Sequence, residues 1–402
     1  MSMDINEILK KLNSINWNFD FTINYDRDMI RPFNCRKYYS YPATFIPEIP
    51  YTLIEILSKK GDVVLDPFGG IGTTFMQAIS LERIPFTYDI NPIATSVCDA
   101  LYRLFDPDFG HEDVKARLLE MCDKYIETHN YSDLLSSYHN ELKGWFEEHT
   151  FNELSFLFDV YAKTLNSDLR LVLGLILPSI LTTLSSQNKG WAYIADNVKP
   201  KNDEFRQKNV FDQYRLSVKM LLGDIENQLR LFPKTYSNFY RSIRNTPRVL
   251  TGSIVNATLE NKSIDLIITS PPYPRMIDYV KSQRLSFYFS ELNFHDYVAM
   301  ETGARYRRTR IDTLEKYEEQ INDINKKMFE LLKADGFLCL ILPDYDRDDN
   351  RKEVIDRIVK WYFEAGLEEV AKIARYIPSH KRTLSIQWAS LVNEHIYVFQ
   401  KR

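Results

Sequence analysis

The sequence predicts an α/β fold with a mostly parallel sheet of seven strands and helices on both faces. Short apolar runs such as 63–65 and 264–269 fit strands that are buried on both faces. These runs alternate with longer segments whose apolar residues recur at helical spacing, which is typical of a parallel sheet. The last two strand-like runs, at 367–374 and 395–400, predict an antiparallel pair that closes the sheet.

The composition indicates a large core and no membrane segment. The 402 residues are 44% hydrophobic with a formal net charge of -4, which neither indicates nor excludes nucleic acid because only a basic face matters. No run of 18 uncharged apolar residues occurs, and the N-terminus lacks a basic region followed by an apolar one. The four cysteines stand far apart and form no Cys-x-x-Cys pair. We expect a cytoplasmic protein with no metal.

The N-terminal quarter predicts an arm and then the first half of the sheet. A helix is expected at 5–12, and Pro42, Pro47 and Pro50 break the next stretch, so that a second helix starts at about Pro50 and ends at 58. Beyond it, strands are expected at 63–65 and 85–89, alternating with helices at 73–81 and from about 92.

The middle of the chain has a different character. Residues 95–245 hold few glycines and carry apolar residues at helical spacing, in segments at 114–125, 142–146, 151–163, 169–184 and 214–231. We predict a helical insertion at 100–245, the target-recognition candidate, between two halves of a sheet domain at 1–99 and 246–402. The almost uniformly apolar segment 171–184 is expected to be its buried helix.

Strand character returns after the insertion. Further strands are expected at 247–253, 264–269, 336–342, 367–374 and 395–400, with long helices at 314–332 and 354–365. Together with the two early strands they make seven, and the last pair is expected to form an antiparallel hairpin.

The run Asp66-Pro-Phe-Gly-Gly-Ile-Gly-Thr-Thr74 joins an expected strand to an expected helix. Three glycines allow a tight turn, and the turn leads into a helix N-terminus, so that the backbone can approach a small ligand closely. The run lacks the Gly-Lys-Ser/Thr of a nucleotide-phosphate loop and the spacing of a dinucleotide loop. A plain strand-to-helix turn is the alternative.

Asp89 ends the second expected strand, 17 residues after Gly72. A carboxylate at this place in an α/β sheet suits bonding to ribose hydroxyls, because it accepts two hydrogens at once. The alternative is that Asp89 caps the helix that begins near Pro92.

The run Ser270-Pro271-Pro272-Tyr273 directly follows an expected buried strand. Ligands bind at the carboxyl ends of strands in open α/β sheets, and two prolines hold the backbone in a set direction there. Pro-Pro-Tyr also serves as a ligand of proline-binding modules, but a position directly after a buried strand does not favour that alternative.

Together the two runs resemble the cofactor loop and the catalytic loop of S-adenosylmethionine-dependent amino-group DNA methyltransferases, of cytosine-N4 or adenine-N6 type. Tyr-Pro-Ala-Thr-Phe at 41–45 and Asp-Ile-Asn-Pro at 89–92 are similar to two further parts of this family, although Thr44 stands where many relatives have lysine. The resemblance implies a Rossmann-like class I methyltransferase fold and cofactor contacts from Thr44, Phe45, Asp66, Pro67, Phe68, Gly69, Gly70, Gly72, Thr73, Thr74, Asp89, Ile90 and Ser253.

The resemblance also implies catalysis by Ser270, Pro271, Pro272 and Tyr273. An exocyclic base amine is a poor nucleophile because its lone pair is shared with the ring. The Ser270 hydroxyl and the Pro271 carbonyl would accept its hydrogens, and Tyr273 would stack on a base that has left the duplex. No strong general base is needed, since the proton can leave after methylation.

The form of the catalytic loop bears on the target base. Ser-Pro-Pro-Tyr is more typical of cytosine-N4 enzymes in this family, and Asp- or Asn-Pro-Pro-Tyr of adenine-N6 enzymes. We expect a site-specific DNA methyltransferase acting on cytosine N4 in a restriction-modification system, with a separate companion endonuclease as a candidate partner. The alternatives are adenine-N6 methylation of DNA, guanine-N2 methylation of RNA and a catalytically silent DNA-binding protein.

Double-stranded DNA is the expected substrate, and basic residues near the catalytic loop are candidates to hold its phosphates. A predicted helix at 278–292 would place Lys281, Arg284 and Tyr288 along one side. The DNA-contact candidates are Lys189, Trp191, Arg275, Lys281, Arg284, Arg305, Arg307, Arg308 and Arg310. Basic clusters at 241–248 and 375–382 could equally be solvated faces.

Overall fold

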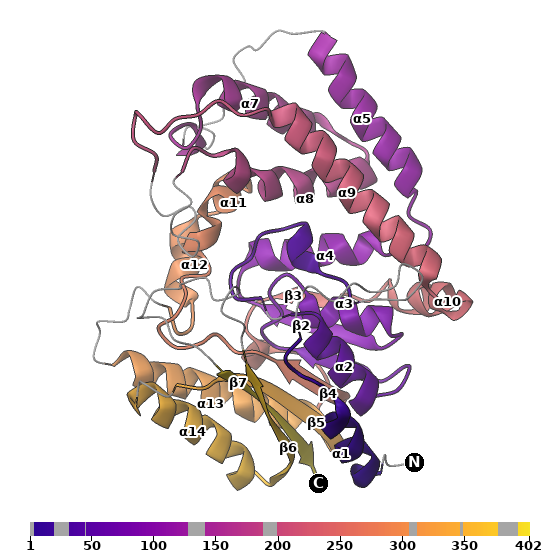
Figure 1. The fold of residues 1–402 in the computed structure, drawn as a ribbon, viewed down its shortest axis with the longest axis vertical. Coiled ribbons are helices and arrows are strands. Elements are labelled where there is room, and N and C mark those ends of the chain that lie inside the picture. The colour runs from indigo at the N-terminus through magenta and orange to yellow at the C-terminus, as the bar shows by residue number, and fades with distance from the viewer. Residues whose placement is uncertain are drawn as a thin grey trace.

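A computed structural model describes residues 4–19, 32–44, 46–127, 141–187, 199–304, 312–345, 349–376 and 393–402. Its centre is one seven-stranded sheet in the order β3-β2-β1-β4-β5-β7-β6 (Figure 1). The strands are β1 Val63–Asp66, β2 Ile84–Asp89, β3 Val249–Thr251, β4 Ile264–Thr269, β5 Leu332–Pro343, β6 Leu367–Tyr376 and β7 Asn393–Lys401. The first five pair in parallel, whereas β7 runs antiparallel to both β5 and β6. The predicted fold class is confirmed.

Helices cover both faces of the sheet because its central strands are apolar on both sides. Along β5, Phe337, Cys339 and Ile341 face one buried cluster, and the residues between them face another. The first cluster is covered by α1 Ile5–Ser14, α2 Glu48–Leu57 and part of α3 Thr73–Ser80. The second is covered by α13 Thr313–Leu331 and α14 Asp349–Glu364. This arrangement fits strands that read as continuous apolar runs.

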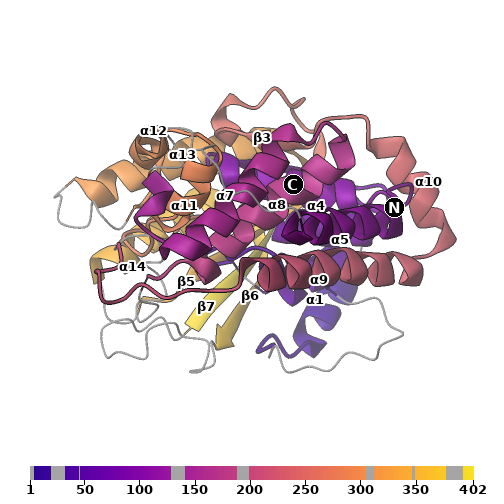
Figure 2. The ribbon, with the colours of Figure 1, turned by 90° about the horizontal axis from the view of Figure 1, so that it is seen from above.

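The segment between the two halves of the sheet is helical. It contains α4 Pro92–Leu104, α5 His111–Glu127, α7 Glu148–Lys163, α8 Ser167–Leu184, α9 Val210–Leu231 and α10 Lys234–Ile243. Figure 1 shows α5, α7, α8 and α9 gathered at one end of the molecule, remote from α13 and α14. Figure 2, seen from above, shows α9 beside α5, which it contacts. The predicted boundary between 99 and 100 falls inside α4, which contacts β2 and β3 as well as α8.

Helix α8 is the most apolar of these helices. Among the described helices, it alone has the length and hydropathy that a membrane crossing requires, and 56% of that window is buried inside the protein. It contacts α4, α5, α7, α9 and α11, as expected of the central helix of a bundle. We therefore describe α8 as the buried helix that the sequence predicts.

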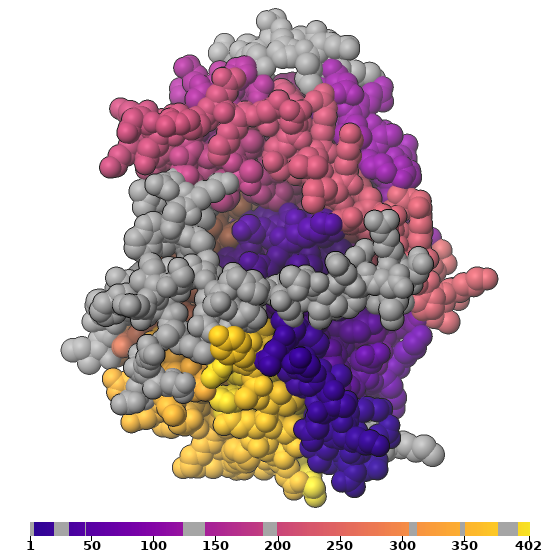
Figure 3. Space-filling view, viewed as in Figure 1, coloured from indigo at the N-terminus to yellow at the C-terminus, as the bar shows by residue number. Residues whose placement is uncertain are grey.

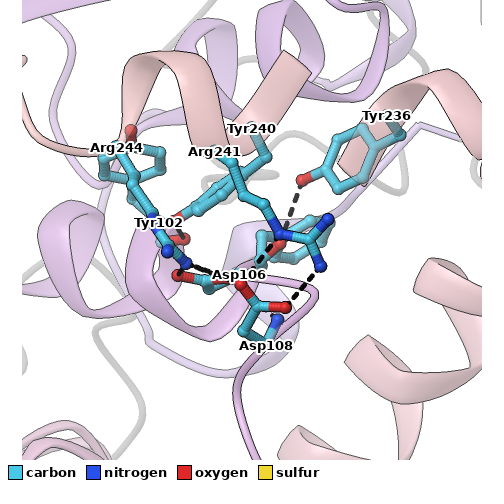
Figure 4. Close-up of polar contacts among 8 residues, drawn as sticks. Tyr102, Asp106, Asp108, Tyr236, Tyr240, Arg241 and Arg244 are labelled. Atoms are coloured by element: carbon cyan, nitrogen blue, oxygen red, sulfur yellow. Dashed lines mark hydrogen bonds and ion pairs between the residues drawn. The ribbon is translucent and has the colours of Figure 1, made fainter. Parts of the chain in front are cut away.

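Helix α10 returns the chain to the sheet and is anchored on the turn between α4 and α5 (Figure 4). The Tyr240 hydroxyl donates to the Tyr102 carbonyl at 2.8 Å, and Tyr236 donates to the carbonyl of Phe105. On the surface, Arg241 and Arg244 form ion pairs with Asp106 and Asp108. The basic cluster at 241–248 is thus largely engaged within the protein.

The N-terminal helix lies beside the C-terminal strands (Figure 3). The Asn18 side chain accepts a hydrogen bond from the backbone N–H of Tyr376 at 2.7 Å, at the end of β6. The Trp17 indole N–H donates to the Leu12 carbonyl and closes the end of α1. This packing covers the face of β6 and β7 that would otherwise be open.

The predicted helix at 278–292 is wrong in its length. A 3₁₀ turn, Lys281–Gln283, leads into the short helix α11 Arg284–Phe289, and α12 Phe294–Met300 follows. Two local features limit α11: the N–H of Tyr279 bonds to Glu301 instead of starting a helix, and Glu291 has φ of 57°, which ends it. The regular spacing of Lys281, Arg284 and Tyr288 along one helix is therefore not formed.

Candidate active site

Two loops meet where the strand order reverses. β1 pairs with β2 on one side and with β4 on the other. The sheet therefore grows from β1 through β2 to β3 in one direction, and from β4 through β5 to β7 and β6 in the other. Open α/β sheets bind ligands outside the carboxyl ends of the strands at such a switch point. The glycine loop after β1 and the Ser-Pro-Pro-Tyr loop after β4 both lie there.

The glycines of the first loop are required by close approaches. A Cβ on Gly69 would lie 1.6 Å from the Thr87 hydroxyl oxygen in β2. Gly72 precedes α3 with φ of 90°, and a Cβ there would lie 2.4 Å from the sulfur of Cys98. These contacts press the loop against β2 and α4, so the backbone itself forms one wall of the site.

Asp66 connects the glycine loop to the end of β4 through hydrogen bonds beneath the pocket. One of its oxygens accepts the Phe68 N–H at 3.1 Å and the Thr269 hydroxyl at 2.9 Å, and the other accepts the Thr74 hydroxyl at 2.7 Å. The carboxyl group is 1% exposed, and this burial raises its pKa to about 6. Asp66 therefore connects β1, α3 and β4 and does not line the pocket above them.

The raised pKa of Asp66 predicts a pH dependence of stability. The folded protein binds this proton more tightly than the unfolded chain, so the free energy of unfolding should fall as pH rises from about 4 to about 6. The contribution is at most about 3 kcal/mol for two pKa units. Denaturant unfolding of the Asp66→Asn variant across this range should show a smaller decrease than the wild type. An identical decrease in both proteins would contradict the assignment.

Asp89 anchors the tip of the glycine loop. One of its oxygens accepts the Gly70 N–H and the other accepts the Asn91 N–H, both at 2.8 Å. Asn91, and not Asp89, caps α4, since its side chain accepts from Ile93 N–H. Each carboxylate oxygen retains acceptor capacity toward the pocket. Burial raises the pKa of Asp89 to about 6.

The arm before α2 closes over the glycine loop. Tyr41 is buried, and its ring stacks on Tyr279 with centroids 6.0 Å apart. A Cβ on Gly70 would lie 3.3 Å from this ring. The Thr44 hydroxyl donates to the Tyr41 carbonyl at 3.1 Å. Because the arm turns back on itself here, it contributes side chains to the pocket from residues more than twenty positions before the loop.

These elements line a pocket at the carboxyl ends of β1, β2 and β4, where ligands bind in open α/β sheets. The predicted residues that line it are Thr44, Pro67, Phe68, Gly69, Gly70, Thr73, Asp89, Ile90, Ser253, Ser270 and Pro272. Asp66, Gly72, Thr74, Pro271 and Tyr273 lie outside the lining, and Phe45 is outside the described residues. The pocket thus brings the predicted cofactor loop and the catalytic loop together.

Sequence reasoning missed an acidic residue in this pocket. Glu301 lines it, is 3% exposed and accepts the Tyr279 N–H. Its second oxygen is buried and has no hydrogen-bond partner among the described residues. Burial raises the pKa of Glu301 to about 8. No local pattern around position 301 marks it, because the contact depends on how the chain after the catalytic loop folds back.

The catalytic loop is tied to the last two strands. The Ser270 hydroxyl donates to the Tyr273 hydroxyl at 3.3 Å, and Tyr273 donates to Glu394 of β7 at 3.0 Å. The other oxygen of Glu394 is paired with Arg375 of β6. Burial, followed by the Glu394 charge, raises the pKa of Tyr273 well above its usual value. The Tyr273 hydroxyl therefore keeps its proton and remains a donor.

The predicted DNA contacts are only partly within the described residues. Arg275 has φ of 62°, and its N–H bonds to the carbonyl of Gly303. The Arg284 guanidinium lies 4.9 Å from the Phe294 ring centroid, so it packs α11 on α12. Lys281 lies in the 3₁₀ turn. The candidates Lys189, Trp191, Arg305, Arg307, Arg308 and Arg310 lie outside the described residues.

The site has the chemistry of a small-molecule pocket beside hydroxyl and carbonyl acceptors. Within the part of the chain that the structure describes, no group of His, Cys, Asp and Glu could hold a metal ion. Of the described residues that line the pocket, Asp89 and Glu301 carry carboxyl groups; Asp89, with its pKa of about 6, is ionised at neutral pH and favours a ligand that carries positive charge. The fold and the two loops define a Rossmann-like methyltransferase.

Comparison with known proteins agrees with this class. Residues 9–97 match the DNA methylase family. The chain is 20% identical to the Type II methyltransferase M.MjaII of Methanocaldococcus jannaschii, over 85% of this chain and 77% of that protein. It is 21% identical to M.MvaI of Kocuria varians over 73% and 64%, and 25% identical to M.BsoBI of Geobacillus stearothermophilus over 61% and 50%.

These matches span between half and about three quarters of the length of the relatives. They confirm the resemblance to the amino-group DNA methyltransferases that the two loops predict. The family classification implies the use of S-adenosylmethionine.

Proposed function

We propose that this protein is a site-specific DNA methyltransferase that transfers a methyl group from S-adenosylmethionine to N4 of cytosine. The observation that supports it most is the meeting of the glycine loop and Ser270 in one pocket at the switch point of the sheet. The names of the relatives suggest that it serves a restriction-modification system, with a companion endonuclease acting separately.

The residues that line the pocket suit S-adenosylmethionine in charge and in hydrogen-bonding capacity. Asp89 would accept the ribose hydroxyls, since it lines the pocket and one of its oxygens bonds the Gly70 N–H at the tip of the glycine loop, while the other bonds the Asn91 N–H. Glu301 brings a second carboxyl group into the same pocket, and one of its oxygens has no hydrogen-bond partner among the described residues. The cofactor supplies an electrophilic methyl group on a sulfonium. The acidic lining suits that cation, and the glycine backbone allows close contact.

Removing the Asp89 carboxylate should weaken cofactor binding. We expect Asp89→Ala to lose about 1.5–3 kcal/mol, the range for hydrogen bonds to a charged group, or roughly 10- to 150-fold in affinity. Titration calorimetry would measure it, with Asp99→Ala as the control because Asp99 pairs with Arg103 outside this pocket. Wild-type affinity should also fall as pH drops through about 6 and Asp89 takes up a proton. Unchanged affinity of Asp89→Ala would contradict the ribose assignment.

Ser270 and the catalytic loop would act on the base amine. The Ser270 hydroxyl and the Pro271 carbonyl accept its two hydrogens, which moves the nitrogen lone pair out of conjugation with the ring. The Tyr273 ring stacks on the flipped base and holds it in place. The amine nitrogen then attacks the methyl carbon in line with the carbon–sulfur bond that breaks, and the amine proton leaves afterward. Orientation is the main contribution of these residues.

The choice between cytosine N4 and adenine N6 rests on Ser270. We expect DNA from cells that express the protein to contain N4-methylcytosine within one short sequence. Sequencing that separates N4-methylcytosine from N6-methyladenine would test this, with cells expressing Tyr273→Ala as the matched control. Methylation of adenine alone would replace the cytosine proposal. Methyl transfer to tRNA and not to DNA by the purified protein would contradict both.

A further inference from the structure

Two buried charged residues on the last strands contact the catalytic loop from outside the cofactor pocket. Glu394 is the second residue of β7, and Arg375 lies directly opposite it in β6. They are 8% and 5% exposed, and their side chains form an ion pair. Neither lines the pocket. Tyr273 reaches across β5, which separates β4 from β7, to place its hydroxyl on Glu394.

The free-energy cost of burying the Glu394–Arg375 ion pair calls for an explanation. Desolvation of two charges costs several kcal/mol per ion, and apolar residues of similar volume often give equal or better stability. Stability alone therefore explains the pair poorly. The pair provides the Tyr273 hydroxyl with a fixed, charged acceptor. Hydrogen bonds to a charged group are roughly twice as strong as those between neutral groups.

The direction of the hydrogen bonds follows from the acceptor. An ionised carboxylate can only accept, so the single Tyr273 hydroxyl hydrogen is committed to Glu394. Tyr273 must then accept from Ser270, whose single hydroxyl hydrogen is committed in turn. Both lone pairs of the Ser270 oxygen are left to accept from a base amine. The polarity of the chain is thus set at Glu394, two strands away from Ser270.

We propose that Glu394, held by Arg375, is a positioning residue for methyl transfer that orients the Tyr273 ring and, through its hydroxyl, the acceptor lone pairs of Ser270. This inference rests on the proposed function of the catalytic loop. It adds to that function a dependence on the last two strands, which carry none of the recognised motifs.

The Glu394→Gln variant tests the polarity with little change in shape. Arg375 can only donate and would hold the amide oxygen, which turns the amide NH₂ toward Tyr273. Tyr273 would then accept from Gln and donate to Ser270, the reverse of the wild-type chain. We expect single-turnover methyl transfer to duplex DNA to slow by about 10- to 100-fold, since small errors of alignment cost this much. Cofactor affinity by calorimetry should stay within about twofold of wild type.

A double-mutant cycle separates positioning from mere stability. If Glu394 acts through Tyr273, then adding Glu394→Gln to Tyr273→Phe should slow transfer by less than about threefold further. An equal slowing by Glu394→Gln in both backgrounds would overturn the proposal. Lys401→Met is the matched control, because Lys401 is a buried charge at the other end of β7 that bonds to the carbonyls of Phe329 and Leu332. It should lower the melting temperature without slowing transfer per folded enzyme.

The outcomes distinguish this inference from the proposed function. A wild-type protein that methylates no DNA would contradict the proposed function. An active wild type with an equally active Glu394→Gln variant would overturn the inference alone. A neutron structure, which locates the hydrogens, supplies a readout that does not depend on activity: a Tyr273 hydroxyl that still donates to residue 394 in Glu394→Gln would also overturn the inference.

Discussion

Tyr273→Ala should reduce methyl transfer to DNA by about 1,000-fold while the cofactor still binds. The substitution removes the ring that is proposed to stack on the base, an interaction of roughly 1–3 kcal/mol, and the hydroxyl that bonds to Ser270. Both losses slow the methyl-transfer step, so their effects on the single-turnover rate multiply. Because Tyr273 does not line the cofactor pocket, calorimetry should find affinity within about twofold of wild type.

The Tyr273→Phe variant separates the two roles of the side chain. Phenylalanine keeps the ring and loses the bond to Glu394, so we expect an intermediate rate, about 10- to 100-fold below wild type. If Phe were as inactive as Ala, the hydroxyl would be the essential part and stacking would contribute little. If Ala were nearly as active as wild type, the assignment of Tyr273 to the base would be wrong.

Gly69→Ala should abolish measurable cofactor binding. The new methyl group would lie 1.6 Å from the Thr87 hydroxyl oxygen, and Thr87 is a buried residue in the centre of β2, paired with Asp66. Either the loop or β2 must move, and overpacking of this kind costs about 1–3 kcal/mol of stability. Displacement of the loop also breaks its bond to Asp89. Calorimetry and thermal unfolding would measure the two effects.

Two further variants make the Gly69 prediction specific. Gly223→Ala is the matched control, because a Cβ at Gly223 in α9 meets nothing within 4 Å, and it should bind the cofactor as wild type does. Adding Thr87→Ala to Gly69→Ala removes the clashing oxygen and should restore part of the affinity. Absence of any recovery would show that a contact other than Thr87 excludes a side chain at position 69.

The local sequence determined the strands, the two loops and the class of protein. Short β-branched apolar runs such as β1 and β4 favour buried strands, and the glycines and prolines that follow them favour tight turns. Asp89 was also predictable, because its distance from the glycine loop reflects the length of one helix and one strand. The short α11 was not predictable: its ends depend on Glu301 and on the left-handed Glu291, which periodicity does not report.

Contacts made across the sheet were decided by the tertiary structure alone. Asp66 was predicted to touch the cofactor, yet the structure directs its carboxylate to Thr74 and Thr269. Glu301 enters the pocket from a segment with no motif, and Glu394 reaches the catalytic loop from β7. Sequence spacing predicts neighbours within a helix or a strand. It carries no information on which distant side chains the order β1-β4-β5-β7 brings to one edge, because that order results from burial of the whole sheet between its helices.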